Sequence, residues 1–292
     1  MDMTKKGFRV FAVAFFVLLS YLSVAFAQQN AEFDYTHALD TYARFIPSRS
    51  AWDQPGSVKI TESEFEYDYQ LKAFGKLPVE FSVNSQYIGI DNSTAVELPA
   101  HLTGFTAGLE TTVPLFGLKQ AYFHAGVFPS FYGENWAFGA DHFRIPSKYY
   151  AIYVLNDQWT FVGGAAVFPE FDTTVSPVLG VIYKPNDKLT FHFVTDTQRI
   201  SYALTDKLTL FVEGHESTDN EFIVTRGAAK KVTLEYNEGH LGTGIKFKIN
   251  KYTDITLSGG QIIFNSLKYL DGNGKVVVKN GPYVELRVQV KI

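Results

Sequence analysis

The sequence predicts an all-β protein, an antiparallel transmembrane up-and-down β-barrel of about fourteen strands. Side chains alternate between polar and apolar along most of the chain, and turn residues interrupt the alternation at short intervals. Aromatic residues make up 16% of the chain, with 26 Phe and 17 Tyr. Alternation with a period of two gives a strand one polar and one apolar face. Hairpins of such strands, rich in aromatic residues, are typical of barrels in an outer membrane.

The alternation is clearest in residues 177–215, where four short strands follow one another. Large apolar residues occupy every second position in 189–193, 200–204 and 208–212. This pattern predicts one face toward lipid and one toward a lumen. The polar face carries Thr190, His192, Arg199, Ser201, Thr209 and Glu213.

Similar stretches continue along the chain, the first of them weak. The predicted strands lie near 32–44, 58–73, 79–83, 102–113, 118–128, 148–155, 159–168, 177–184, 188–195, 199–204, 208–215, 232–249, 254–264 and 282–292. Short turns alternate with longer polar links, as in barrels with tight periplasmic turns and longer extracellular loops. An even number of strands puts both termini on the periplasmic side. If the first range is not a strand, one more must be merged or discarded, which leaves twelve.

The stretch 232–249 does not follow a single alternation. Val232, Leu234 and Tyr236 are apolar at even positions, whereas Leu241 and Ile245 are apolar at odd ones. Either residues 237–240 form a turn, or a bulge there shifts the parity. We expect the bulge, because an extra turn would make the number of strands odd.

The N-terminus has the pattern of a secretory signal peptide, residues 1–27. Three basic residues precede an apolar run, and Ala25-Phe26-Ala27 supplies the cleavage site. The apolar run is near the lower length limit for a spanning helix, which disfavours an uncleaved anchor. Residues 28–57 then form a lead-in that is either a first strand or a plug inside the barrel, and residues 58–292 form the barrel. We expect an exported protein in the outer membrane of a Gram-negative-type bacterium.

Composition narrows the possible partners and cofactors. Removing residues 1–27 takes away three basic residues and Asp2, which leaves 26 − 3 = 23 Lys and Arg against 30 − 1 = 29 Asp and Glu. This acidic balance disfavours nucleic acid as a partner. The chain has 0 Cys, which excludes disulfides, thiolate metal sites and a cysteine nucleophile. No phosphate-binding, dinucleotide or zinc spacing is present, so we expect no cofactor and no metal.

Hairpin register predicts two charged pairs on the lumen face. If Ala73 faces Val79, Lys72 lies opposite Glu80; if Leu204 faces Leu208, Arg199 lies opposite Glu213. Opposed unlike charges on neighbouring strands attract. The pairs are either structural or part of a charged constriction that selects solutes.

Two further stretches of the lumen face stand out. Glu64, Glu66 and Asp68 share one face of a strand and would attract cations or a divalent ion, unless Lys or Arg from across the barrel neutralises them. An apolar inner wall is predicted in the middle of the chain, which suggests a hydrophobic ligand path or, as we expect, a plug supplied by residues 28–57. By parity this wall comprises Ile152, Val154, Val162, Gly164, Ala166, Leu179 and Val181.

A hydrolase is a remote alternative. If Thr195 faces Gln198, His192 lies opposite Ser201, with Glu213 two strands away. A Ser-His-acid set needs mutual hydrogen bonds and an oxyanion site, and strand pairing alone supplies neither. We therefore expect no enzymatic activity.

Several segments resemble a family of uncharacterised bacterial outer-membrane barrels that is known only as a domain of unknown function. The similar segments are 138–145 (FGADHFRI), 177–186 (PVLGVIYKPN), 198–200 (QRI), 211–214 (FVEG), Arg226 and 235–247 (EYNEGHLGTGIKF). The resemblance implies an outer-membrane barrel and supplies no catalytic residues. The alternating C-terminal strand also resembles those that the outer-membrane assembly machinery binds, although Ile292 replaces the usual terminal aromatic residue.

The expected function is passive passage or binding of small solutes in the polar lumen, with the lipid bilayer and the assembly machinery as partners. The alternative is a closed barrel with a structural or surface-interaction role through its loops, above all 129–147.

Overall fold

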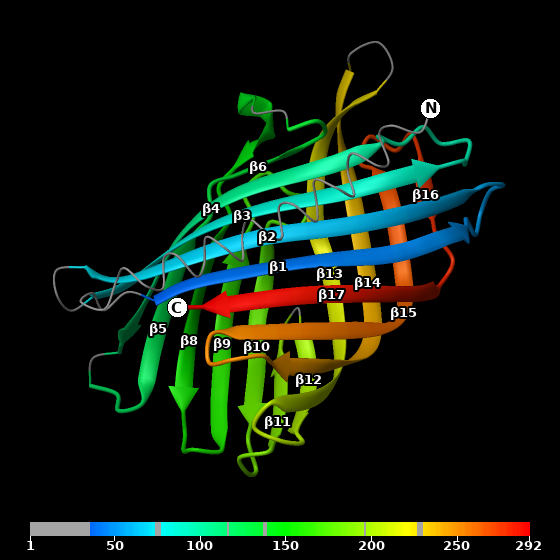
Figure 1. Cartoon of the computed structure of the whole chain (residues 1–292). Helices are drawn as coiled ribbons and strands as arrows, with labels where there is room; N and C mark the ends of the chain where they lie inside the picture. The colour runs from blue at the N-terminus through cyan, green and yellow to red at the C-terminus, as the bar shows by residue number, and fades with distance from the viewer. Residues whose placement is uncertain (1–35, 74–76, 116, 137–138, 196, 227–229) are drawn as a thin grey trace.

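The computed structural model describes residues 36–292 apart from 74–76, 116, 137–138, 196 and 227–229. The predicted signal peptide, residues 1–27, lies outside the described residues. The described residues contain seventeen strands and one short 3-10 helix, η1 (Ala140–His142), and Figure 1 shows their arrangement. The strands are β1 (Thr36–Ser50), β2 (Ser57–Ala73), β3 (Leu77–Asn92), β4 (His101–Pro114), β5 (Ala121–Val127), β6 (Ser130–Gly133), β7 (Phe143–Arg144), β8 (Ser147–Val154), β9 (Trp159–Val167), β10 (Val175–Tyr183), β11 (Leu189–Val194), β12 (Thr197–Ala203), β13 (Leu208–Arg226), β14 (Lys230–Lys248), β15 (Thr253–Tyr269), β16 (Lys275–Val277) and β17 (Gly281–Lys291).

Fourteen of these strands close an antiparallel barrel, as the sequence predicts. Around the ring the order is β1, β2, β3, β4, β5, β8 through β15, and β17, which returns to β1. β1 and β17 pair from Ala38 opposite Lys291 to Phe45 opposite Val284. The weak first stretch of the sequence is therefore a full barrel strand, and the described part of residues 28–57 lies in the wall rather than in the lumen.

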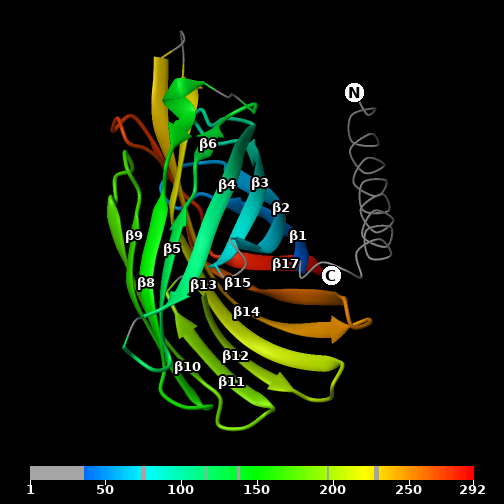
Figure 2. The same ribbon diagram turned by 90° about the vertical axis from the view of Figure 1, so that its left-hand side faces the viewer.

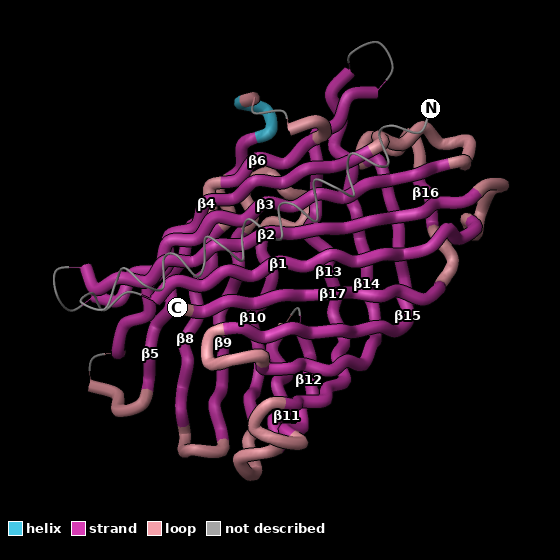
Figure 3. Tube along the Cα trace, in the orientation of Figure 1, coloured by secondary structure: helices cyan, strands magenta, loops and turns pink. Residues whose placement is uncertain are grey.

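The two ends of the barrel differ in the length of their connections, and Figure 3 separates strands from loops by colour. At one end, named the turn end here, lie the links 74–76, 115–120, 155–158, 184–188, 204–207 and 249–252, together with both ends of the described chain. There His37 N donates to Ile292 O at 2.8 Å. The other end, named the loop end, carries the connections 51–56, 93–100, 128–146, 168–174, 195–196, 227–229 and 270–280. The predicted alternation of short and long links holds for most connections, apart from the short link at 195–196. It is wrong for 216–231, because β13 extends to Arg226 and β14 begins at Lys230, which leaves only three residues between them.

The strands are unequal in length, and this makes the barrel lopsided. β8 to β12 have between 6 and 9 residues, whereas β13 and β14 have 19 each. In Figure 2, β8 and β9 lie on one side of the molecule and β1 and β17 on the other. At the loop end β6 replaces β5 as the partner of β4, and Gly133 pairs in parallel with Ile223 of β13. β6 thereby closes a narrower ring that excludes the short strands.

We name the loop-end part of β1 to β4, β6, β13 to β17 the narrow ring, and the fourteen-stranded part toward the turn end the wide ring. The interior of the narrow ring is an apolar core. Side chains from β1 to β4 pack there against side chains from β13 to β15, and these residues are fully buried. Among them are Ile46, Ile60, Ile88, Leu102, Phe222, Leu234 and Leu267.

Apolar side chains face the other way in the wide ring, where they cover the outer surface. Leu179 is 60% exposed and Phe247 is 45% exposed. At the turn end, outward rings of neighbouring strands stack, with centroids 4.1 Å apart for Trp159 and Tyr183 and 5.8 Å apart for Tyr183 and Phe191. Such an outer apolar band edged by aromatic residues is the surface that a barrel presents to lipid. Among the described residues, no helix is long and apolar enough to cross a membrane.

The change of side explains the irregular stretch in β14. The strand is continuous, and its even positions face inward through Val232, Leu234, Tyr236 and His240. A register shift between Gly239 and His240 confirms the predicted bulge site, but the extra residue belongs to β15, between Ile262 and Phe264. The expected parity shift along β14 is therefore wrong. Its apolar residues change from even to odd positions because the apolar surroundings change from the interior to the outer surface.

Candidate solute site in the barrel lumen

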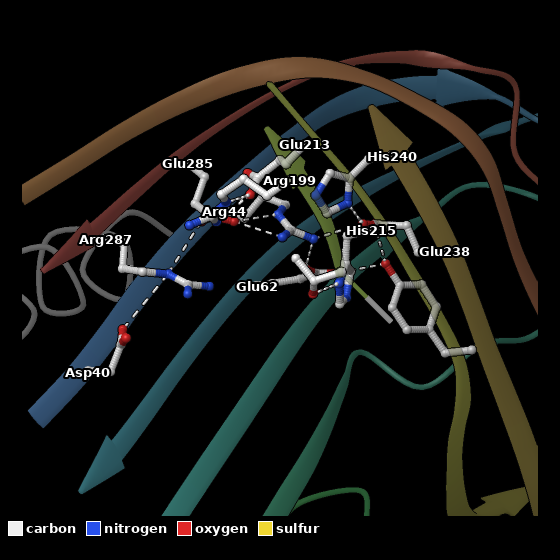
Figure 4. A network of polar contacts seen from close by, with 12 residues as sticks. Asp40, Arg44, Glu62, Arg199, Glu213, His215, Glu238, His240, Glu285 and Arg287 are labelled. Atoms are coloured by element: carbon white, nitrogen blue, oxygen red, sulfur yellow. Dashed lines mark hydrogen bonds and ion pairs between the residues drawn. The ribbon is translucent and has the colours of Figure 1, made fainter. Parts of the chain in front are cut away.

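A band of charged side chains crosses the lumen below the apolar core of the narrow ring (Figure 4), with Arg44 of β1 at its centre. Arg44 Nη1 donates to Glu62 Oε2 at 3.1 Å and to Glu238 Oε1 at 2.8 Å. Arg44 Nε and Nη2 donate to Glu285 Oε2 at 3.0 and 2.7 Å. These four side chains come from β1, β2, β14 and β17 and are all buried, so one guanidinium joins strands from both sides of the ring closure.

Tyr236 completes the inner part of this band. Its hydroxyl lies 2.5 Å from Glu62 Oε1 and 2.8 Å from Glu238 Oε2, and it accepts from Asn265 Nδ2 at 3.1 Å. A tyrosine hydroxyl has a single proton to donate, so it satisfies one carboxylate at a time. Three carboxyl groups around one guanidinium, with one shared hydroxyl, leave this part of the lumen net negative.

A second part of the band lies toward β12 and β13. Arg199 lies opposite Glu213, as predicted, and its Nε donates to Glu213 Oε2 at 2.9 Å. The same guanidinium lies over the Phe211 ring, 4.5 Å from its centroid. Charge-assisted hydrogen bonds of this kind fix the orientation of a guanidinium more strongly than charge alone.

A third arginine, Arg287 of β17, lies between Asp40 and Glu285, with Nε to carboxylate distances of 3.8 and 3.6 Å. The three arginines surround a half-enclosed cavity of about 180 Å³. His215 and His240 face each other beside it, with ring centroids 5.2 Å apart. The cavity is smaller than the roughly 300–1,000 Å³ of sites for drug-sized ligands, so it fits only a small solute. Its lining comprises Tyr42, Arg44, Glu64, Thr197, Arg199, Glu213, His215, His240, Glu285 and Arg287.

An acidic wall continues from the cavity toward the turn end along β1 to β4. Glu64, Glu66 and Asp68 follow one another on the lumen face of β2, and Asn84 Nδ2 donates to Glu64 Oε1 at 2.8 Å. Two like-charged pairs lie directly opposite each other, Asp40 with Glu66 and Glu80 with Glu110. Opposed like charges destabilise a sheet, so this arrangement costs stability.

The predicted pair of Lys72 with Glu80 is wrong. The link 74–76 is shorter than assumed, so Lys72 lies opposite Pro78 and Glu80 lies opposite Gln70. Gln70 Nε2 donates to Glu80 Oε2 at 2.5 Å. Glu80 therefore lies among the carboxylates of the acidic wall, and it is not directly opposite Lys72.

The predicted apolar inner wall is correct for β8 and β9 and wrong for β10. Ile152 pairs with Val162, and Gly164 pairs with Val178, so Val178, Gly180 and Ile182 form the lumen face of β10. Leu179 and Val181 face outward, because the parity does not carry across the link 168–174. An apolar wall still faces the acidic wall, and it comprises Ile152, Val154, Val162, Ala166, Val178 and Ile182.

The predicted pairing of His192 with Ser201 is also wrong. Val194 pairs with Thr197, which places His192 opposite Arg199 and Ser201 opposite Thr190. The three residues of the hydrolase alternative are therefore not brought together. Among the residues that the structure describes, no group of three or more metal-ligating side chains is present.

Sequence reasoning missed the centre of the band. Arg44 lies in the weak first strand, and its partner Glu238 is 194 residues away. One signal was present: Glu62 shares the parity of Glu64, Glu66 and Asp68, and Glu238 shares the parity of the apolar residues before it. A carboxylate on the inward parity of a strand indicates a buried polar network, although it does not name the partner.

Comparison with solved structures shows the fold. An outer membrane channel from Pseudomonas putida F1 has a TM-score of 0.50 and 9% identity, over 90% of this chain and 97% of that one. A FadL homologue from Pseudomonas aeruginosa has a TM-score of 0.47 and 10% identity, over 88% of this chain and 89% of that one. No curated protein matches the chain. The model of a family described as a domain of unknown function, DUF6268, matches residues 121–292, more than half of the chain, which therefore belongs to that family.

Proposed function

We propose that this protein is a passive channel for small solutes in the outer membrane, with the charged band as its selective constriction. The observation that carries the proposal is the cavity of about 180 Å³ in the lumen, which three arginines and their carboxylate partners surround. Rings of fixed charge at a narrow point are a common way for pores to select what passes. The likeness to an outer membrane channel supports the barrel architecture that such a function needs.

The acidic wall gives the proposed channel its preference. Asp40, Glu66 and Asp68 lie in the lumen on the turn-end side of the constriction, and opposed like charges there keep the local potential negative. A lumen that is lined by negative charges and surrounded by a wall of low dielectric constant concentrates cations. The channel therefore favours small cations over anions, and the apolar wall across from the carboxylates accommodates a cation that carries apolar groups.

Single-channel recording of the refolded chain 28–292 in a planar bilayer tests this proposal. We expect unitary steps with a reversal potential that shows cation preference. Replacing Glu64 and Glu66 by Gln and Asp68 by Asn keeps side-chain size and removes three lumen charges, so the cation preference falls. The matched control replaces Asp157, Asp187 and Asp206, one in each of three exposed turns, by Asn and leaves the preference unchanged.

A folded barrel that gives no unitary steps at any voltage, either as the wild type or after truncation of the loop-end links, contradicts the channel and favours the second candidate, a closed barrel that acts through its loops. One observation favours that candidate: fully buried apolar side chains from both sides of the narrow ring pack against one another inside it. In that case the loop-end segment 129–147, which includes β6, η1 and β7, is the surface of interest.

Export belongs to the same proposal. We propose that residues 1–27 are removed and that the barrel begins with β1, within the predicted lead-in 28–57, because β1 pairs with both β2 and β17. N-terminal sequencing of the protein from outer-membrane fractions tests the cleavage, and we expect Gln28 as the first residue. A chain that keeps residues 1–27 contradicts the proposal.

A further inference from the structure

The packed interior of the narrow ring blocks the direct way through the barrel. Ile60, Leu102 and Phe222 are 0% exposed, and they come from opposite sides of that ring. A solute that enters the wide ring from the turn end therefore cannot continue through the narrow ring. The remaining way to the loop-end surface leads past the rim where β8 to β12 stop, because these strands do not extend into the narrow ring.

The link between β9 and β10, residues 168–174, lies at this rim. Most of the link is exposed, but Phe171 is only 7% exposed. Its ring packs edge-on against Phe168 at 5.7 Å and against Tyr132 of β6 at 6.0 Å, measured between centroids. Tyr132 in turn packs edge-on against Phe222 at 5.8 Å. Phe171 thus connects the rim of the wide ring to the core of the narrow ring.

Two backbone hydrogen bonds lie within this link, from Phe168 N to Thr174 O at 2.8 Å and from Phe171 N to Phe168 O at 3.3 Å, and two side-chain contacts tie it to its surroundings. Asp172 N donates to Glu221 Oε1 at 2.6 Å, and Arg144 Nη1 lies 3.0 Å from Glu170 Oε2. Glu170 has a φ of +68°, in the left-handed region that a residue with a side chain rarely adopts. Residues 169, 170 and 172–174 are exposed, and one buried aromatic ring anchors the link to the rest of the barrel. Exposed links of this kind belong to the less stable part of a fold, where moving segments are found.

We propose that residues 168–174 are the gate of the solute path and that Phe171 is its latch. The proposal rests on the proposed channel function. In the state seen here Phe171 closes the rim by packing between Phe168 and Tyr132. Opening withdraws the Phe171 ring and breaks the contact of Arg144 with Glu170. The lumen of the wide ring then opens to the exterior at the loop-end rim of β8 to β12. Closure is the favoured state because opening exposes a large apolar side chain to water.

Single-channel recording of the chain 28–292 tests the latch directly. We expect Phe171→Ala to raise the open probability by at least about tenfold, because the loss of one buried aromatic side chain shifts an equilibrium by that much or more. Val175→Ala is the matched control, since Val175 borders the same link and is 58% exposed. Arg144→Glu also raises the open probability, and the added change Glu170→Arg restores part of the closure.

Thiol labelling gives a second measurement that does not depend on conductance. The chain has 0 Cys, so one introduced cysteine is the only target. Ala166, on the lumen face two residues before Phe168, is 4% exposed. A charged thiol reagent added from the loop side should label Ala166→Cys at least about tenfold faster when Phe171→Ala is also present. Thr173→Cys, in the exposed part of the link, labels rapidly in both backgrounds.

The outcomes separate the gate from the channel. If Phe171→Ala folds, conducts as the wild type does and leaves Ala166→Cys protected, the gate is overturned and the channel stands. If the wild type and Phe171→Ala both fold and neither conducts, the channel function fails, and the gate fails with it. Folding is checked in each case by circular dichroism of the refolded barrel.

Discussion

The narrow ring and the wide ring share their longest strands but bury opposite kinds of side chain. Along β13, Phe222 and Val224 face inward in the narrow ring, whereas in the wide ring Glu213 faces inward and Val212 is 50% exposed on the outer surface. The outer surface of the narrow ring is polar and includes the ion pair of Lys268 with Glu235 at 3.4 Å. The narrow ring is therefore built like a water-soluble β-protein, and the wide ring like a lipid-embedded one.

The difference teaches that one strand can serve two solvents, in two ways. In β13 the inward parity changes from odd to even at the register shift between Ser217 and Asn220, whereas in β14 the even positions face inward throughout. Only the identity of the residues at each parity changes along β14, and the charged band lies at the level where the change occurs. The following substitutions test this division, from the largest expected effect to the smallest.

Arg44→Met should cost about 3–5 kcal/mol of the free energy of unfolding, because it leaves the buried carboxyl groups of Glu62 and Glu238 without their arginine and leaves Glu285 with Arg287 alone as its arginine partner. Urea unfolding of the barrel in lipid vesicles measures the change. Arg199→Met is the control and should cost less, since the Arg199 side chain is 34% exposed. A cost for Arg44→Met no greater than that of the control would mean that the band is not a joint between the two rings.

Leu234→Ala should cost about 2–5 kcal/mol, because Leu234 is fully buried in the narrow ring and its truncation leaves a cavity. Leu257→Ala, in the wide ring, should cost about 1 kcal/mol or less, because Leu257 is 55% exposed on the outer surface and lipid fills the space. The same unfolding measurement compares the two. Equal costs would contradict the assignment of the two surfaces.

Arginine on the outer face of β14 distinguishes the two solvents directly. Ile245→Arg places a charge in the apolar band and should cost about 2–4 kcal/mol at the membrane midplane. Thr233→Arg, at the same parity twelve residues earlier on the narrow ring, should change stability by no more than about 0.5 kcal/mol. Vesicle unfolding reports both, and a cost of several kcal/mol for Thr233→Arg would place the narrow ring in lipid.

Glu66→Gln should stabilise the barrel by about 0.2–1 kcal/mol, because it removes the repulsion from the directly opposed Asp40. The same variant should conduct with a weaker cation preference, read from the reversal potential. Thr41→Ser, one position along β1 on the opposite face, is a control for disturbance of the strand. Loss of stability on removal of the charge would show that the acidic wall is neutralised by a counter-ion.

The sequence was sufficient for the features that depend on short-range pattern. Alternation and turn residues predicted fourteen strands, and the register across residues 205–207 placed Arg199 opposite Glu213 correctly. It failed where one residue more or less in a link changes the pairing, as for Lys72 with Glu80 and His192 with Ser201. The residue that faces a given position depends on the number of residues in the turn between the two strands, and the composition of a turn does not fix that number.

The centre of the candidate site depends on long-range closure, which alternation does not report. Arg44 meets Glu238 and Glu285 only because β1 closes the ring next to β17 and because the narrow ring brings β14 near β1. The same closure explains why β14 was misinterpreted. A local pattern gives the faces of a strand, whereas the fold decides which face meets lipid, water or another sheet.

The pairing of β1 with β17 also governs when the barrel can form. The residues that β1 and β17 pair, such as Ala38 and Lys291, lie near opposite ends of the described chain. The pairing that closes the ring is therefore the contact of longest range in sequence. Until Gly281–Lys291 is in place, the edges of β1 and β15 lack a partner along most of their length, and open edges associate with other strands. Closure is thus slow, since long-range contacts carry the greatest entropic cost of loop formation. Ring closure is then the last step of assembly, and the edges of β1 and β15 must be protected from other strands until β17 pairs with both.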